Sequence, residues 1–369
     1  MKQSVIVYAN RSASALVVAW LYVNVQHDVR GCGAKLPNLA REGIMIRQRV
    51  LRGTLLGAAV VIVAAAAGCG RLAVWSAPAK TPTATRTAAA VEADKLFWKT
   101  LHAGAYDRIP DALTAVKAAY LENPRDAVTA AHVGWLHIWR LGERARQPAL
   151  RPDITDDAVL SRKYFEEAVR LDPGEARYLG FYASLLMAEG TIHKDEKMVR
   201  QGFYAMKDAV RAWPEFNYFT AGYTASGQPV ESDRFREAVE QQWLNLDVCT
   251  GQKVDRANPD YAKYMALETT EGPRRVCWNS WIAPHNLEGF FLNFGDMLVK
   301  AGEPDVAETM YRNARHAREY GTWPYKAVLE ARIRDAAKNV EAFRRTEPGP
   351  DAATLMVRST FACMGCHQE

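Results

Sequence analysis

Residues 164–173 of the chain read YFEEAVRLDP, a helical pattern that ends at a proline. Two other stretches end in the same way: residues 118–124 read AAYLENP and residues 207–214 read KDAVRAWP. Proline stops a helix because it lacks the backbone N–H and fixes its own φ angle. Around these stretches the chain is rich in Ala, Leu, Glu and Arg, and alternating strand patterns are nearly absent. We therefore predict an all-α fold.

The three prolines recur at intervals of 49 and 41 residues. A tetratricopeptide (TPR) repeat is a helix–turn–helix unit of about 34 residues with a proline at its end. Polar stretches with helix breakers, at residues 143–157 and 191–197, would supply the excess length as insertions. Small and aromatic residues at packing positions, such as Gly134 and Trp135, complete a pattern that resembles the TPR family over about residues 94–248 and 287–320. The resemblance implies a superhelical groove that docks a partner; an irregular helical domain without a groove is the alternative.

Residues 361–369 read FACMGCHQE and hold a Cys-x-x-Cys-His motif. This spacing is typical of c-type haem attachment. On a helix, two thiols three residues apart lie on one face, so both can reach the vinyl groups of one porphyrin. Cys363 and Cys366 would carry one covalent haem c, and His367 would be the proximal axial ligand of its iron. The rivals are a zinc site, for which a second Cys/His pair is missing, and a redox disulfide, for which a βαβ context is missing.

The haem-bearing helix is expected to start near Asp351, within a C-terminal attachment segment over residues 347–369. Met364 lies inside the motif, so a sixth ligand of the iron must come from earlier in the chain. His285 is the first candidate for this distal ligand, because it follows a proline and precedes a helix among aromatic residues. The alternative is that His285 belongs to the start of that helix, whose expected N-cap is Asn286.

Covalent haem attachment takes place outside the bacterial cytoplasm, and the sequence contains an export signal. Residues 45–68 combine three arginines, a short apolar run and small residues, which is the layout of a signal peptide. The AAGC at its end resembles a lipoprotein processing box, so Cys69 is expected to carry a lipid. Ordinary signal cleavage and an uncleaved anchor are the alternatives. Residues 1–44 precede a complete signal, so translation is expected to begin at Met45, with a second hydrophobic segment as the alternative.

The charge of the chain argues against nucleic acid as a partner. The whole sequence has 47 basic and 42 acidic residues, but residues 1–69 hold 8 of the basic and 2 of the acidic ones, which leaves a mature net charge of −1. Residues 69–93 are rich in Ala, Thr and Pro and are expected to tether the helical repeat domain, residues 94–346, to a membrane. Gly70 stands where an Asp would indicate retention at the inner membrane, which slightly favours the outer membrane.

Cys249 and Cys277 remain once Cys69 is lipidated and two cysteines bind haem. In an exported protein, this pairing favours a disulfide that closes the loop-like segment between them. Two buried free thiols are the alternative.

Together these features predict a membrane-tethered, mono-haem c-type cytochrome that transfers electrons between periplasmic or cell-surface partners, which it docks through its repeats. The second hypothesis is a TPR-type scaffold or assembly lipoprotein whose haem is structural or senses redox state or gas. A haem enzyme such as a peroxidase is the third. Nothing in the sequence demands an enzyme, because no catalytic triad pattern, phosphate loop or metal-ligand cluster is present.

Overall fold

The computed structural model describes residues 73–146, 154–345, 354–358, 361 and 363–369. The chain divides into two units, residues 1–79 and 80–369. In the first unit, the described residues include one helical turn at 73–75 with exposed side chains. The expected signal peptide and Cys69 lie outside the described residues.

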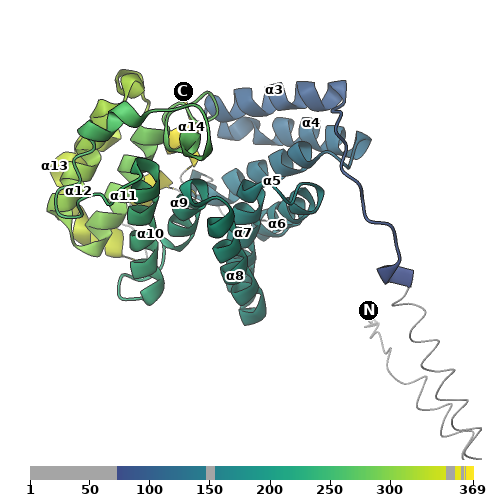
Figure 1. The fold of residues 1–369 in the computed structure, drawn as a ribbon, viewed down its shortest axis with the longest axis horizontal. Helices are drawn as coiled ribbons and strands as arrows, with labels where there is room; N and C mark the ends of the chain where they lie inside the picture. Colours follow the sequence, from purple (N-terminus) through teal and green to yellow (C-terminus); the bar gives the residue numbers. More distant parts are fainter. Residues whose placement is uncertain (1–72, 147–153, 346–353, 359–360, 362) are drawn as a thin grey trace, which may run out of the picture. The chain divides into compact units, whose positions relative to one another are not determined.

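The second unit is built from helices, and the all-α prediction is confirmed for the described part of the chain, which contains no strand. Figure 1 shows them following one another in sequence order. The α-helices are α3 (Ala88–His102), α4 (Ile109–Glu122), α5 (Ala127–Gly142), α6 (Ile154–Leu171), α7 (Ala176–His193), α8 (Glu196–Ala212), α9 (Pro214–Ala225), α10 (Asp233–Thr250), α11 (Asn286–Ala301), α12 (Pro304–Arg312), α13 (Lys326–Arg344) and α14 (Cys363–His367).

The helices begin and end where local chemistry requires it. Pro124 and Pro173 lie just beyond α4 and α6, and Pro214 is the first residue of α9, where its missing N–H leaves no bond unmade. The Asp126 side chain caps α5 by accepting hydrogen bonds from the backbone N–H groups of Val128 and Thr129. The repeated breaks therefore divide the first part of the body, α3 to α9, into helices of 12 to 18 residues.

One of the two predicted insertions is wrong. Residues 191–193 continue α7 to a length of 18 residues, and only Lys194 and Asp195 separate it from α8. Lys194 has a left-handed backbone (φ 55°), and its N–H donates to the carbonyl of Thr191, which closes the turn. The extra residues between Pro173 and Pro214 thus lengthen α7 instead of forming a loop. The other predicted insertion, residues 143–157, includes residues 147–153, which lie outside the described residues.

Neighbouring helices pack in sequential pairs: α3 with α4, α5 with α6, α7 with α8, α9 with α10 and α11 with α12. Gly134 on α5 shows why small residues occur at these contacts. A Cβ atom there would lie 2.7 Å from the ring of Phe165 on α6, so only glycine permits this separation of the two helices.

The expected tether is shorter than predicted, because part of residues 69–93 belongs to the helical body. Helix α3 starts at Ala88, capped by the Thr87 hydroxyl. Arg86 forms ion pairs with Asp94 and Asp126, and the latter is on the edge of α5. These residues are polar and lack an apolar period, so hydropathy alone did not reveal that they pack. In this cluster, burial opposes the ionisation of Asp94, but hydrogen bonds from His132 and Arg86 lower its pKa to about 2.

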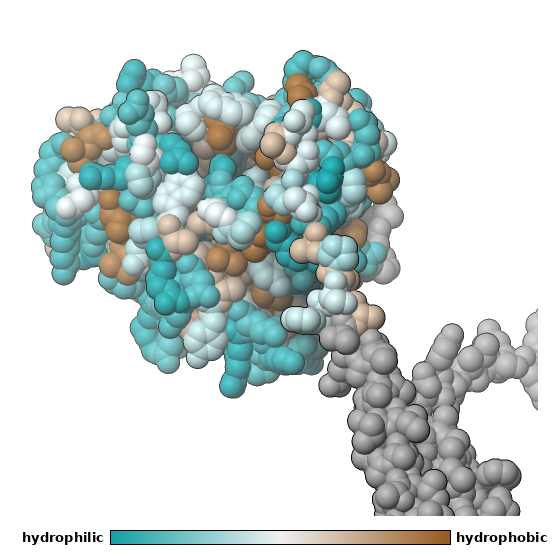
Figure 2. Space-filling view, turned by 45° about the vertical axis from the view of Figure 1, so that its right-hand side comes forward, coloured by the Kyte–Doolittle hydropathy of each residue, from teal (hydrophilic) through white to brown (hydrophobic). Residues whose placement is uncertain are grey.

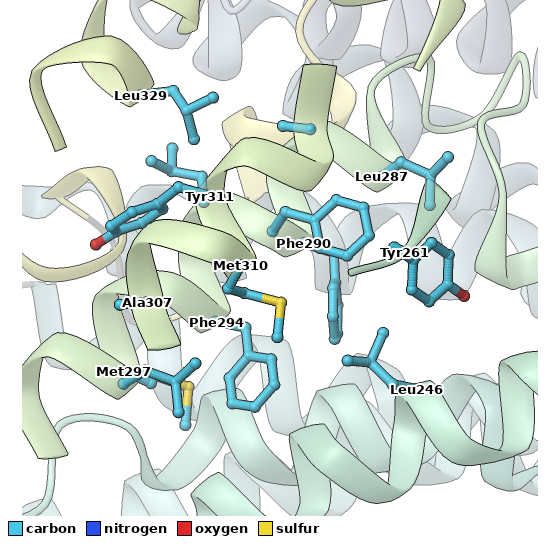
Figure 3. Close-up of a cluster of buried hydrophobic side chains, with 14 of the residues drawn as sticks. Leu246, Tyr261, Leu287, Phe290, Phe294, Met297, Ala307, Met310, Tyr311 and Leu329 are labelled. Atoms are coloured by element: carbon cyan, nitrogen blue, oxygen red, sulfur yellow. The ribbon is translucent and has the colours of Figure 1, made fainter. Parts of the chain in front are cut away.

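Two large apolar clusters form the core. One lies among α10, α11, α12 and α13 and includes Phe290, Phe294, Met310 and Tyr311 (Figure 3). The other lies among α3, α4 and α5. Met364 of α14 is part of this second cluster, although it is far away in sequence.

The surface carries no broad apolar face in the view of Figure 2, where hydrophobic residues form small groups among hydrophilic ones. Large exposed apolar side chains of the described residues are scattered over several elements, such as Leu121, Phe203 and Trp281. Within the described ranges, no helix has the length and apolar character that crossing a membrane requires.

A disulfide joins Cys249, at the end of α10, to Cys277, with the two Cα atoms 5.8 Å apart. These are the two cysteines that the sequence analysis paired. The segment between them contains only short 3-10 turns, at Ala262–Leu267 and Pro273–Cys277. The disulfide therefore holds the end of α10 beside the loop that leads into α11.

The chain before α14 differs from the expected long helix. Residues 351–353 lie outside the described residues, and Leu355–Arg358 form a short 3-10 turn in which Met356 (φ 53°) and Val357 (φ 51°) are left-handed. A β-branched residue rarely adopts this conformation. The fully buried carboxylate of Asp296 accepts a hydrogen bond from the Met356 N–H at 2.9 Å, and Arg332 binds both Asp296 and the carbonyl of Thr354. This cluster anchors the turn, so a continuous α-helix does not run through residues 355–358 into α14.

Candidate functional site

Helix α14, which contains the whole Cys-x-x-Cys-His motif, lies between α3 and α11. Its backbone is held from three directions. The His285 N–H donates to the Cys366 carbonyl at 3.0 Å, and the Trp323 Nε1–H donates to the Gly365 carbonyl at 2.9 Å. The Glu369 N–H donates to the carbonyl of His102, the last residue of α3, at 2.8 Å. A five-residue helix cannot satisfy its own carbonyls, so these contacts fix its position.

The contact between α14 and α11 depends on a glycine. A Cβ atom at Gly289 would lie 2.4 Å from the Cys366 Sγ and 2.6 Å from the carbonyl carbon of Gly365. Glycine at this position lets the backbones of the two helices approach closely. As a result, the Cys366 thiol packs directly against α11, where it also faces the carbonyl of Asn286 at 3.8 Å.

The two thiols face different apolar surroundings. Cys363 is half-buried and packs on two clusters, of which one includes Trp135 and Phe181. Cys366 borders a small pocket that is partly open to solvent. The pocket is lined mainly by apolar and aromatic side chains of α9, α10 and α11, among them Phe219, Tyr223 and Phe290, and by the Cys249–Cys277 disulfide.

The electrostatics of the pair do not match a reactive dithiol. Burial, and the nearby Glu143, raise the pKa of Cys363 to about 12. Burial also raises the pKa of Cys366, with contributions from Cys363 and Glu288. Redox-active cysteines lie in electropositive surroundings that lower the thiol pKa. Within the described residues, no three His, Cys, Asp or Glu side chains come together as metal ligands.

The His367 ring is oriented by a backbone carbonyl. Its Nδ1 lies 2.7 Å from the carbonyl oxygen of Ile282. Because a carbonyl only accepts, Nδ1 must carry the proton, and a neutral ring then has its lone pair on Nε2. Burial lowers the pKa of His367 to about 4, against the hydrogen bond to Ile282, so the ring is neutral near pH 7. Among the described residues, none hydrogen-bonds to its Nε2.

His102 shares the same acceptor, with its Nε2 3.3 Å from the Ile282 carbonyl oxygen. The sequence offers His102 only as one of several candidate distal ligands and does not reveal the role of the Ile282 carbonyl. The available signal was the neighbouring aromatic pair, Trp98 on α3 and Trp281, whose ring centroids are 5.0 Å apart.

His285 lies beside Cys366, near the C-terminal end of α14, where its N–H donates to the Cys366 carbonyl. Its buried ring places Nδ1 3.0 Å from Glu288 Oε1, and its ring centroid is 6.4 Å from that of Trp323. It occupies the N-cap position of α11, which begins at Asn286, but its side chain makes no capping bond. The distal role of His285 stays a prediction, and the contact of its Nδ1 with Glu288 leaves Nε2 for an iron.

The donor set fits a c-type haem: two thiols and an oriented neutral imidazole lie on one short helix, next to apolar and aromatic side chains. Comparisons with known proteins add no assignment, since no family model, no curated protein and no solved structure matches the chain.

Proposed function

We propose that the chain is a membrane-tethered, mono-haem c-type cytochrome that transfers electrons between partners in the periplasm or at the cell surface. The observation that carries this proposal is the hydrogen bond from His367 Nδ1–H to the Ile282 carbonyl, at 2.7 Å. A metal-binding histidine typically donates its second ring N–H to a carbonyl or carboxylate, which fixes the tautomer and aims the other nitrogen at the metal. His367 has this arrangement.

Cys363, Cys366 and His367 would hold the haem. Each thiol would add across one vinyl group: an S–C bond forms and the S–H hydrogen ends on the adjacent carbon, so no oxidant or reductant is consumed. When bound, the haem supplies one-electron Fe(III)/Fe(II) chemistry. The chain's own part is to keep the His367 ring neutral and oriented and to surround the thiols with apolar side chains, which limit the access of water.

The helical body would act as the docking surface for redox partners. Its succession of paired helices with breaks at Pro124, Pro173 and Pro214 supports a TPR-like array. The predicted export signal and lipidated Cys69 would tether this body to a bacterial membrane, with the outer membrane slightly favoured. Export agrees with the compartment in which haem c is attached.

A second candidate is a TPR-type scaffold whose haem is structural or senses redox state or gas. It is supported by one observation: the pocket beside Cys366 has no histidine or methionine among its described lining residues. An electron carrier with two strong axial ligands would be expected to provide one of these.

The test is to produce the full chain in a host with c-type haem maturation and to extract it with acid–acetone, which removes non-covalent haem. The Cys363→Ala/Cys366→Ala variant is compared with Cys249→Ser/Cys277→Ser, which alters the other two cysteines of the folded body. We expect covalent haem in the parent and in the second variant only, with a reversible one-electron wave in protein-film voltammetry. A parent without retained haem would refute the cytochrome and leave the scaffold as the leading function.

A further inference from the structure

Five aromatic side chains form a continuous row across the first helices of three successive helix pairs. We call this set, Trp135 of α5, Phe181 of α7, and Phe216, Phe219 and Tyr223 of α9, the aromatic row. Successive ring centroids are 5.6, 6.1, 4.7 and 5.7 Å apart. All but Tyr223 are half-buried, so the row is neither part of a closed core nor fully exposed.

Each thiol shares its surroundings with one end of the aromatic row. Cys363 and the rings of Trp135 and Phe181 pack on the same apolar cluster. Cys366 borders the same pocket as Phe219 and Tyr223. A flat, apolar group attached to both sulfurs would therefore extend along the aromatic row. The row presents ring faces and edges to such a group and two polar groups, the Trp135 Nε1–H and the Tyr223 hydroxyl.

Among the described residues, the pocket at one end of the row has no strong ligand, and the histidine at the other end is packed against α3. The pocket at the Cys366 end has no histidine, methionine or lysine in its lining. At the other end, the His132 ring centroid is 5.7 Å from that of Trp135. However, the His132 ring stacks on Phe97 at 4.0 Å, and its Nδ1 bonds to Asp94 at 2.8 Å.

A polar side chain, Asn293, is nevertheless buried next to the Tyr223 end of the aromatic row. Asn293 on α11 is 1% exposed, and neither atom of its side-chain amide has a hydrogen-bond partner among the described residues. It lies beside Gly365 of α14 and close to the Tyr223 hydroxyl. Such orphaned groups are rare in folded proteins and are usually satisfied by something bound.

We propose that the aromatic row covers the face of the haem opposite His367 and leaves the sixth position of the iron open to a small neutral ligand of the carbon monoxide or nitric oxide class. This inference rests on the proposed haem attachment and adds gas binding to it. Distal pockets set ligand binding through polarity, donors and steric access. Here the aromatic row supplies the apolar cover, and Tyr223 with Asn293 supplies the polar contacts.

The first measurement uses the full, matured chain in detergent. Covalent haem is established by acid–acetone extraction, and absorption and electron paramagnetic resonance spectra are then recorded, with carbon monoxide added to the reduced protein. We expect a high-spin signal and a spectral change on adding carbon monoxide. Covalent haem with a low-spin spectrum and no response overturns the open position but leaves the cytochrome intact. If that spectrum becomes high-spin in His285→Ala, the distal ligand is His285. Absence of covalent haem overturns both proposals.

The second measurement tests the place of the aromatic row. Phe181→His and Phe219→His each introduce an imidazole into the row, and Phe203→His introduces one on α8, where Phe203 is 36% exposed. We expect at least one row variant to become low-spin and to lose carbon monoxide binding, whereas Phe203→His remains like the parent. If both row variants keep covalent haem and the parent spectrum, the aromatic row does not cover the iron.

Discussion

Replacing Gly289 by alanine tests whether α14 packs against α11 as closely as the structure shows. The new Cβ would lie 2.6 Å from the carbonyl carbon of Gly365 and 2.4 Å from the Cys366 Sγ. Carbon atoms in contact are about 3.5–4.0 Å apart, so α14 must move by about 1 Å. Overpacking costs about 1–3 kcal/mol, and alanine regains about 1 kcal/mol over glycine in a helix. The net loss is therefore at most about 2 kcal/mol.

Because the clash falls on α14, most of this loss should appear as local opening of the motif. Because α11 stays helical when α14 opens, the gain from alanine does not offset this local loss, and a change of about 1–2 kcal/mol alters the opening equilibrium about 5–30-fold. In haem-free protein at fixed pH, we expect alkylation of Cys363 and Cys366, followed by mass spectrometry, to accelerate by about that factor. Gly321→Ala is the control, since a Cβ there meets no atom within 4 Å. Equal alkylation rates in Gly289→Ala and the parent would refute the close contact between the two helices.

Three other predictions concern stability, measured by urea unfolding. Asp296→Ala removes the ion-pair partner of the buried Arg332 and should cost about 3–5 kcal/mol. The control, Asp208→Ala, removes the exposed ion pair with Arg211 and should cost less than about 1 kcal/mol. Similar losses in the two variants would contradict the anchoring role of the Asp296 carboxylate. Burial opposes ionisation of Asp94, but two hydrogen-bond donors lower its folded pKa to about 2, below the unfolded value of about 3.9. Its contribution is therefore complete above about pH 4 and lost as the pH falls toward 2, and Asp94→Asn should flatten that part of the stability profile. Cys249→Ser/Cys277→Ser should lose about 3 kcal/mol, and an unchanged unfolding midpoint would show that the crosslink adds nothing.

Helical periodicity and the prolines were sufficient to predict an all-α chain divided into units. They did not predict the length of α7, because residues 191–193 are as compatible with a helix as with a loop until the turn at Lys194 is known. The start of the body was also misplaced. Arg86 packs through ion pairs to Asp94 and Asp126, and contacts of that kind leave no hydrophobic period in the sequence.

The motif itself identified Cys363, Cys366 and His367 as candidates. The sequence did not reveal their partners, since Ile282 contributes a backbone carbonyl and Gly289 contributes the absence of a side chain. Neither role depends on a local pattern. The expected long helix before the motif failed for a similar reason: a single buried carboxylate, Asp296, binds the backbone of Met356 and holds it in a left-handed turn.

The position of α14 also has a consequence for the order of biogenesis. Its contacts with His102 and Gly289 join parts of the chain that are remote in sequence, and such contacts form late in folding. Until α14 docks, both thiols are accessible to an attachment enzyme; afterwards Cys366 is packed against α11. Under the proposed haem attachment, insertion is therefore expected to precede closure of the helical array. A variant that folds faster than the enzyme works would accumulate as stable protein without cofactor.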